Sequence, residues 1–160
     1  MNEANGNLRD SSGAAVRPPI AWALTVAAGL ALDWLYALPL LPAAMPAGEL
    51  GGIVFLAGLA LLIWAAATFR RAGTQVQLSR PTTTIVDEGP YRFTRNPIYL
   101  GMMLIIIALA IGFNDLWLLI ALAPFALVIR YGVVAREEAY LQGKFGEAYR
   151  AYRARVRRWL

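Results

Sequence analysis

Four apolar runs constrain this chain more than any other feature of its sequence. They extend roughly over Ile20–Leu41, Leu50–Phe69, Ile98–Ile111 and Leu116–Val134. A helix needs about 20 apolar residues to cross ~30 Å of hydrocarbon, and three of the runs come close to or exceed that length. The third run, with 14 residues, is short for a perpendicular crossing. Because 59% of all residues are hydrophobic, the sequence predicts an all-α integral membrane protein with about four transmembrane helices.

The segments around these runs predict one membrane domain over residues 18–160. Residues 1–17 are polar and lack the basic start and small-residue cleavage site of a secretory signal, so we expect a short disordered tail. The last two runs are separated only by the tight turn Gly112–Asp115 and predict a helical hairpin. Residues 70–97 form a long polar loop, and residues 135–160 follow the hairpin as a charged C-terminal segment.

The lysines and arginines alternate between the two sides of this topology. Two lie in the N-terminal tail, five in the loop 70–97 and eight from Arg130 onward, whereas the turns at 42–49 and 112–115 contain none. This distribution is typical of the positive-inside rule. We therefore expect both termini and the loop 70–97 at the cytoplasmic face of the inner (plasma) membrane. The net charge of +5 is explained by orientation and by anionic lipid headgroups, without a nucleic-acid partner.

The absence of two residue types restricts the chemistry that this chain can perform. It contains no cysteine and no histidine, which excludes thiolate nucleophiles, imidazole bases and the commonest metal ligands. We therefore expect no metal site. Any reaction must rely on Asp, Glu, Tyr, Arg, Asn or a cofactor.

The C-terminal segment keeps one apolar face although it is rich in charge. Its members recur at steps of three and four residues, as in an amphipathic helix: Val134, Glu138, Leu141, Phe145, Tyr149, Tyr152, Val156 and Trp159. Gly143 and Gly146 weaken such a helix by about 1 kcal/mol each relative to alanine, so we expect a kink or a helix–turn–helix between them. The remaining arginines are expected to contact lipid headgroups: Arg150, Arg153, Arg155, Arg157 and Arg158.

One carboxylate, Glu138, lies on the apolar face of this segment with Glu137 beside it. A buried carboxylate must be paired or neutralised. Two interpretations are open. Glu138 forms an ion pair with Arg130 or Arg136, or it receives a cationic group of a ligand.

A second carboxylate, Asp33, interrupts the first apolar run. A charge in the middle of a membrane costs at least ~2.5–3.5 kcal/mol on insertion scales. Asp33 is therefore either a site residue or lies near a helix end beside Trp34 and Tyr36. Together with Arg130 and Trp64 it is a candidate for a substrate pocket.

The densest polar cluster, GPYRFTRNPIYLG at residues 89–101, directly precedes the third apolar run. Arg92 and Arg95 can bind a carboxylate in bidentate geometry. Pro97 suits the first turn of the following helix, whose free N–H groups favour anions. Tyr91 and Tyr99 supply flat apolar walls with polar tips. The cluster is thus suited to a charged small molecule at a membrane surface.

This cluster and the C-terminal pattern together resemble the isoprenylcysteine carboxyl methyltransferase family and the related phospholipid N-methyltransferases. In that family G-x-Y-x-x-x-R-H-P-x-Y-x-G precedes a helical hairpin and E-E-x-x-L-x-x-x-F-G-x-x-Y-x-x-Y follows it. The matching residues here are Gly89, Tyr91, Arg95, Pro97, Tyr99 and Gly101, then Glu137, Glu138, Leu141, Phe145, Gly146, Tyr149 and Tyr152. The resemblance covers about residues 85–157, nearly half of the chain.

The resemblance implies a membrane enzyme that binds S-adenosylmethionine at the cytosolic face and takes a hydrophobic or lipid substrate from the bilayer. Arg95 and Glu138 are the implied catalytic residues. Glu137 or Glu138 would receive the ammonium of the cofactor or stabilise a pocket arginine. The implied cofactor-binding residues are Tyr91, Arg95, Asn96, Pro97, Tyr99, Gly101, Glu137 and Glu138.

Asn96 departs from the family pattern, since the eukaryotic carboxyl methyltransferases have histidine at this position. Asparagine can keep a hydrogen bond but cannot titrate, so we expect Asn96 to hold the cofactor rather than to transfer a proton. The available bases are then Glu137, Glu138, Asp87, Glu88 and the tyrosines. This favours an acceptor that is anionic or easily deprotonated. Carboxylate, thiol and amine acceptors stay open, and so does phospholipid N-methylation.

Two other classes of protein compete with the methyltransferase. One is a small four-span cation transporter with Asp33 or Glu138 as its coupling carboxylate, and the other is a structural membrane subunit. A transporter of this kind would have short loops throughout. Here the 28-residue loop 70–97 and the 26-residue segment 135–160 carry most of the polar pattern, which favours the enzyme.

Overall fold

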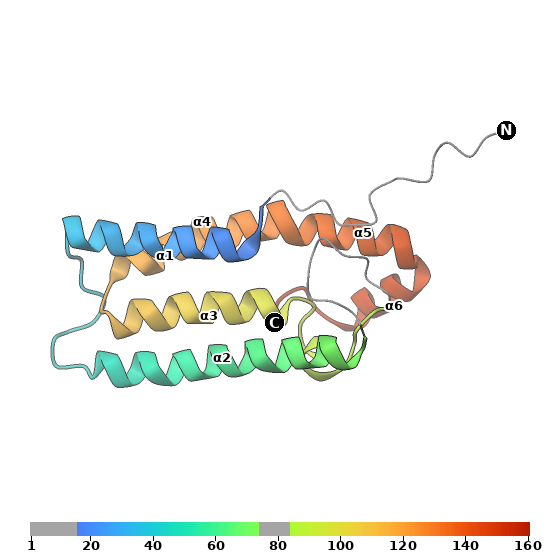
Figure 1. Cartoon of the computed structure of the whole chain (residues 1–160), viewed down its shortest axis with the longest axis horizontal. Coiled ribbons are helices and arrows are strands. Elements are labelled where there is room, and N and C mark those ends of the chain that lie inside the picture. Colours follow the sequence, from blue (N-terminus) through green and yellow to red (C-terminus); the bar gives the residue numbers. More distant parts are fainter. Residues whose placement is uncertain (1–15, 74–83) are drawn as a thin grey trace.

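Four long helices run side by side and form the body of the molecule (Figure 1). The computed structural model describes residues 16–73 and 84–160. α1 packs on α4, α2 packs on α3, and α3 also contacts α4. A short 3-10 helix, η1, precedes α3, and the π-helical segment η2 joins α4 to α5. The bounds are α1 (Pro18–Leu35), α2 (Ala47–Arg71), η1 (Gly89–Arg92), α3 (Pro97–Gly112), α4 (Leu116–Leu127), η2 (Val128–Val134), α5 (Ala135–Phe145) and α6 (Glu147–Arg155).

Three helices are long and apolar enough to cross a membrane. They are Pro18–Leu35, Ala47–Arg71 and the continuous helix Leu116–Phe145, which has 30 residues. α3 is equally apolar but has 16 residues, or about 24 Å at 1.5 Å per residue. Within the described ranges every regular element is a helix. The predicted all-α membrane protein and the hairpin of the last two apolar runs are therefore confirmed.

The first helix ends earlier than the apolar run predicted. α1 stops at Leu35 and not at Leu41, because Pro39 disfavours helical geometry at the residue before it. The N–H of that residue, Leu38, instead donates to Asp33 Oδ1 over 3.1 Å. Asp33 thus lies near a helix end, as one of the two sequence interpretations held. The C-terminal end of α1 lies at the end of the bundle opposite to α6 (Figure 1).

The last long helix passes the predicted membrane boundary at Val134. It continues through η2 and α5 to Phe145, because no proline follows Pro124 to interrupt it. The helix ends at Gly146, whose φ of 50° belongs to the left-handed region that glycine adopts at low cost. α6 then begins at Glu147, so the predicted helix–turn–helix near residues 143–146 is confirmed.

Small residues let α2 and α3 approach closely. A Cβ atom on Gly51 would lie 2.5 Å from the Cα of Gly112, and a Cβ on Gly101 would lie 2.8 Å from Leu62 Cγ and 3.1 Å from the carbonyl oxygen of Gly58. Helices in membranes associate largely through such close packing. Gly101, which the family resemblance places at the cofactor, is in this structure part of the α2–α3 contact.

Two loops close the end of the bundle that lies away from α6. The side chain of Asn114, at φ 55°, accepts hydrogen bonds from the N–H groups of Leu40 and Leu41 at 3.0 and 2.6 Å. Trp117 Nε1 donates to the carbonyl of Tyr36 over 2.8 Å. These bonds fix the α1–α2 connection against the turn of the hairpin.

Asp115 caps α4 at this end and is fully buried. Its Oδ1 accepts from the Leu118 N–H at 3.2 Å, whereas Oδ2 is buried without a hydrogen-bond partner. Burial raises the pKa of the Asp115 carboxyl. Because this folded-state pKa is raised, the stabilising contribution of the group is complete below the unfolded pKa and is lost as the pH rises through the folded value.

We expect Asp115→Ala to lower the free energy of unfolding by about 0.5–2 kcal/mol, since the helix cap is lost. Asp115→Asn keeps the accepting oxygen and removes the buried charge, so at neutral pH it should be at least as stable as the wild type. That advantage should shrink as the pH falls. Melting temperatures in detergent at several pH values measure both effects. An equal loss of stability in Asp115→Ala and Asp115→Asn would contradict the capping role.

Candidate functional site

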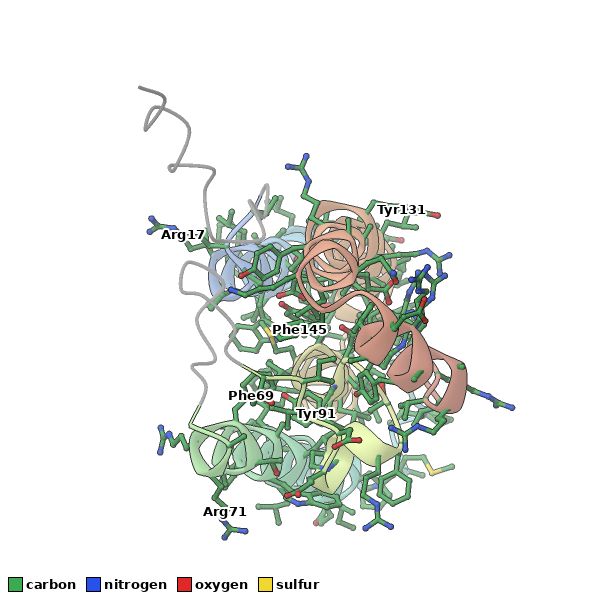
Figure 2. The ribbon with its side chains drawn as sticks, turned by 90° about the vertical axis from the view of Figure 1, so that its right-hand side faces the viewer. Arg17, Phe69, Arg71, Tyr91, Tyr131 and Phe145 are labelled. Carbon is green, nitrogen blue, oxygen red and sulfur yellow. The ribbon has the colours of Figure 1, made fainter. Side chains whose placement is uncertain are left out.

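The polar cluster at residues 89–101, the helix break at Gly146 and the C-terminal residues meet at one end of the bundle. This end carries α6, η1 and the beginning of α3 (Figure 1). Figure 2 looks onto it and shows Phe69, Tyr91 and Phe145 toward the middle and Arg17, Arg71 and Tyr131 toward the periphery. Residues 89–101 and 137–152, which are distant in sequence, therefore form one site.

A tight turn positions the polar cluster over the end of α2. Gly89 has φ 55°, and a Cβ atom there would lie 2.5 Å from Thr68 Oγ1, so the turn requires glycine. The ring of Tyr91 packs edge-on against Phe69 with a centroid distance of 4.8 Å. Pro97 is the first residue of α3, as the sequence predicted. The turn thus presents Arg95 and Asn96 directly at the start of a helix.

The centre of the site is a carboxylate held between two arginines. Arg95 NH1 lies 3.1 Å from Glu138 Oε1, and Arg158 donates to both oxygens of Glu138, at 2.9 Å from Nε and 2.7 Å from NH2. The side chains of Arg95 and Glu138 are 8% and 11% exposed, so water screens this pair little. We refer to Arg95, Glu138 and Arg158 as the buried ion triad.

The partners of Glu138 correct the sequence prediction of a pair with Arg130 or Arg136. The guanidinium of Arg130 instead lies 5.3 Å from the ring centroid of Tyr131 on an exposed face of η2. The sequence predicts contact with lipid headgroups for Arg158, and its spacing gives no sign of the pair with Glu138 because the break at Gly146 separates it from α5.

The triad carries a net positive charge. Two guanidinium groups face one carboxylate, and both oxygens of that carboxylate are already hydrogen-bonded. Arg95 Nε is buried without a hydrogen-bond partner. Leaving a buried donor unpaired costs about 1–3 kcal/mol. The site is therefore suited to an anionic group that reaches Arg95, and Glu138 is already committed to cations of the protein.

Tyr149 contacts Arg95, and two further tyrosines, Tyr152 and Tyr91, extend the site toward the aromatic ring of Phe69. Tyr149 Oη accepts from Arg95 NH1 at 3.3 Å, and Tyr152 Oη donates to the carbonyl of Tyr91 at 2.9 Å. Tyr91 Oη is buried without a partner. Burial raises the pKa of Tyr91 and of Tyr152 above the ordinary value. Both phenols are therefore protonated at neutral pH, so neither acts as a base there.

Glu137 is a second carboxyl group at this site, and neither arginine of the triad pairs with it. Its Oε1 accepts from Tyr99 Oη at 2.9 Å, which joins α5 to the first turn of α3. Within the described part of the chain the structure gives Glu137 no ion pair. The two adjacent carboxylates thus differ in function, since Glu138 balances arginines and Glu137 is available to a cationic group.

The remaining predicted residues lie at different distances from this centre. Asn96 is buried, and its Nδ2 donates to the carbonyl of Arg158 at 2.9 Å. Trp64 is half-exposed and its ring centroid lies 6.5 Å from that of Phe93, so it flanks the turn. Asp33 lies at the opposite end of the bundle and Arg130 points away, so the structure does not gather the proposed substrate-pocket residues.

Comparison with known proteins identifies the family to which the chain is similar. A family model described as phospholipid methyltransferase matches residues 47–148, which is more than half of the chain and extends from the start of α2 into α6. A protein of Haemophilus influenzae (strain ATCC 51907 / DSM 11121 / KW20 / Rd), described as an uncharacterized protein, is 46% identical over 63 residues, which are 39% of this chain and all of that protein. No solved structure matches the chain.

Proposed function

The chain belongs to the phospholipid methyltransferase family, and on this premise we propose that it transfers a methyl group from S-adenosylmethionine to a lipid-like or small hydrophobic acceptor. The observation that carries the proposal is the buried Arg95, which has a free Nε next to a paired carboxylate at one end of a membrane bundle. The family does not support the transporter or the structural subunit.

The residues of the site fit the chemical groups of this cofactor. Arg95 presents an unpartnered donor that suits its carboxylate. Glu137 presents a carboxylate without an ion pair that suits its ammonium. Tyr91 and Phe69 offer apolar ring surface for a purine. In this assignment Glu138 does not contact the ammonium and holds Arg95 in place.

When bound, S-adenosylmethionine supplies an electrophilic methyl group on a sulfonium. The protein has to align the acceptor with that group and to exclude water, and alignment contributes up to ~7–11 kcal/mol in favourable intramolecular cases. The side chains of Arg95 and Glu138 and the buried tyrosines form a wall with little exposure to water. An amine or a thiol acceptor has to lose a proton to a base, whereas a carboxylate acceptor needs none.

In our proposal the acceptor reaches the site from the bilayer, and the large apolar side chains that the helices leave exposed support a lipid environment around them. The end with α6 lies at the cytoplasmic face of the inner membrane in our proposal, as the positive-inside distribution indicates. Phospholipid N-methylation is the alternative within the same family. An assay with a deuterated methyl donor and a lipid extract, read by mass spectrometry, identifies the acceptor.

The direct test is titration calorimetry of the purified protein with S-adenosylhomocysteine. We expect saturable binding, because this product keeps the carboxylate, ammonium and purine groups. Folded protein that binds no S-adenosylhomocysteine in several detergents and lipids would contradict the proposal.

Glu137→Gln is expected to weaken S-adenosylhomocysteine binding by about tenfold or more, since a hydrogen bond to a charged group contributes ~1.5–3 kcal/mol. Tyr99→Phe should have a smaller effect, because it removes only the bond that orients Glu137. Glu88→Gln is the matched control, since Glu88 is an exposed glutamate just before η1. An equal affinity for all three variants would exclude Glu137 from the cofactor site.

A further inference from the structure

The residues after α6 return to the site instead of leaving the molecule. α6 ends at Arg155, and Val156 is extended with φ −119° and ψ 129°. The chain end then lies beside the beginning of α3 (Figure 1). Val156 is buried with Tyr149 and Tyr152. Trp159 packs against the buried core cluster of the membrane helices. Two apolar side chains therefore anchor this short segment at both of its ends.

Between these anchors the backbone of the segment is bonded to the polar cluster. The N–H of Arg95 donates to the carbonyl of Arg157 at 3.0 Å. The carbonyl of Arg158 accepts from Thr94 Oγ1 at 3.1 Å and from Asn96 Nδ2 at 2.9 Å. Three consecutive residues, 94–96, are thus held by two carbonyl groups.

The side chain of Arg158 adds a third connection, to α5. It binds both oxygens of Glu138, the residue that also pairs with Arg95. Charge-assisted bidentate bonds of this kind fix orientation as well as contributing energy. Arg95 is therefore positioned on its backbone by Arg157 and on its side chain by a carboxylate that Arg158 orients.

We propose that residues Val156–Trp159 form a clasp that sets the orientation of Arg95 for the anionic end of the cofactor, with Arg158 as the positioning residue. The inference rests on the proposed function. It also gives Asn96 a role that differs from cofactor contact, since its amide nitrogen holds the clasp. Substituting Arg158 then acts through Arg95 and affects only ligands that carry the group that Arg95 binds.

The test compares two ligands on the same variants by titration calorimetry. S-adenosylhomocysteine carries the amino-acid carboxylate, and 5′-methylthioadenosine lacks it. Arg158→Ala should weaken S-adenosylhomocysteine binding by about tenfold or more, because the charged bonds that orient Arg95 are lost. The affinity for 5′-methylthioadenosine should stay within about twofold of the wild type. Arg157→Ala keeps its carbonyl and removes an exposed side chain, so it serves as the control.

Arg158→Lys keeps the charge but cannot form the bidentate bond. It should also weaken S-adenosylhomocysteine binding, by a smaller factor than Arg158→Ala, and leave 5′-methylthioadenosine binding unchanged. If Arg158→Ala does not fold, the criterion is applied to Arg158→Lys. Unchanged affinity for both ligands, or an equal loss for both, would overturn the clasp and leave the proposed function standing. A wild-type protein that binds neither ligand would instead contradict the proposed function, and the clasp with it.

Discussion

Glu138→Ala is expected to abolish S-adenosylhomocysteine binding and to lower the free energy of unfolding by about 3–5 kcal/mol, the usual effect of removing one partner of a buried ion pair. The variant would leave Arg95, which is 8% exposed, and Arg158 facing each other without the intervening carboxylate. Two like charges with little screening must then separate or admit water. Either response moves the guanidinium that we assign to the cofactor.

Glu147→Ala provides the matched control for this substitution. Glu147 also forms an ion pair, with Arg150, but its side chain is 85% exposed. Exposed pairs typically contribute ~0.2–1 kcal/mol, so binding and stability should stay close to the wild type. Reversible unfolding in mixed micelles and calorimetry with S-adenosylhomocysteine measure the two quantities. Similar losses for both variants would contradict the central role of the triad.

Glu138→Gln separates charge from shape at the same position. The amide can still accept one hydrogen bond from Arg158, but it leaves both guanidinium charges unbalanced. We expect its stability to lie between that of Glu138→Ala and the wild type. Its affinity for S-adenosylhomocysteine should lie closer to the alanine variant, because the position of Arg95 depends on the carboxylate charge.

The pattern of the C-terminal segment was a reliable guide to which residues are buried. Its apolar face was predicted from steps of three and four residues, and Val134, Glu138, Tyr149, Tyr152 and Val156 are all buried. The break at Gly146 was also predictable, because glycine alone tolerates its φ at low cost. Local rules of helix formation therefore account for the elements that carry the site.

The partner of Glu138 could not be predicted in the same way. Periodicity ranks neighbours along one helix, and it suggested Arg130 or Arg136. Arg158 lies beyond the Gly146 break, and the direction that α6 takes after this break depends on tertiary packing of Tyr149 and Tyr152. Likewise the ion pair with Arg95 joins segments across the hairpin, and only the family resemblance brought them together beforehand.

The end of the first helix shows a second limit of the apolar pattern. Hydropathy alone extended the helix to Leu41, since the residues after Leu35 are mostly apolar. Proline at position 39 removes a backbone donor and restricts the residue before it, and the chain turns so that Asp33 can accept from Leu38. The apolar composition thus predicts the membrane segment, whereas the backbone restrictions of Pro39 explain why the helix ends before Leu41.

The contact between α2 and α3 leads to the second large effect. Gly51→Ala is expected to lower the free energy of unfolding by about 1–3 kcal/mol or more, the range for overpacked contacts. A Cβ atom at this position would lie 2.5 Å from the Cα of Gly112 and 2.8 Å from the carbonyl oxygen of Ala108. Both obstacles are backbone atoms, so no rotation of a side chain can relieve the clash.

The neighbouring residue on the same helix provides the control. Nothing lies within 4 Å of a Cβ atom built on Gly52, so Gly52→Ala gains helix propensity of about 0.5–1 kcal/mol without a clash. The two variants carry the same chemical change one residue apart and should shift the melting temperature in micelles in opposite directions. Because helices in a membrane gain little from hydrophobic burial against each other, close backbone contact is what holds α3 on α2. Equal stability of the two variants would mean that the helices can separate at this point without a cost in free energy. The close α2–α3 contact would then not hold α3 in place, nor the polar cluster that precedes α3.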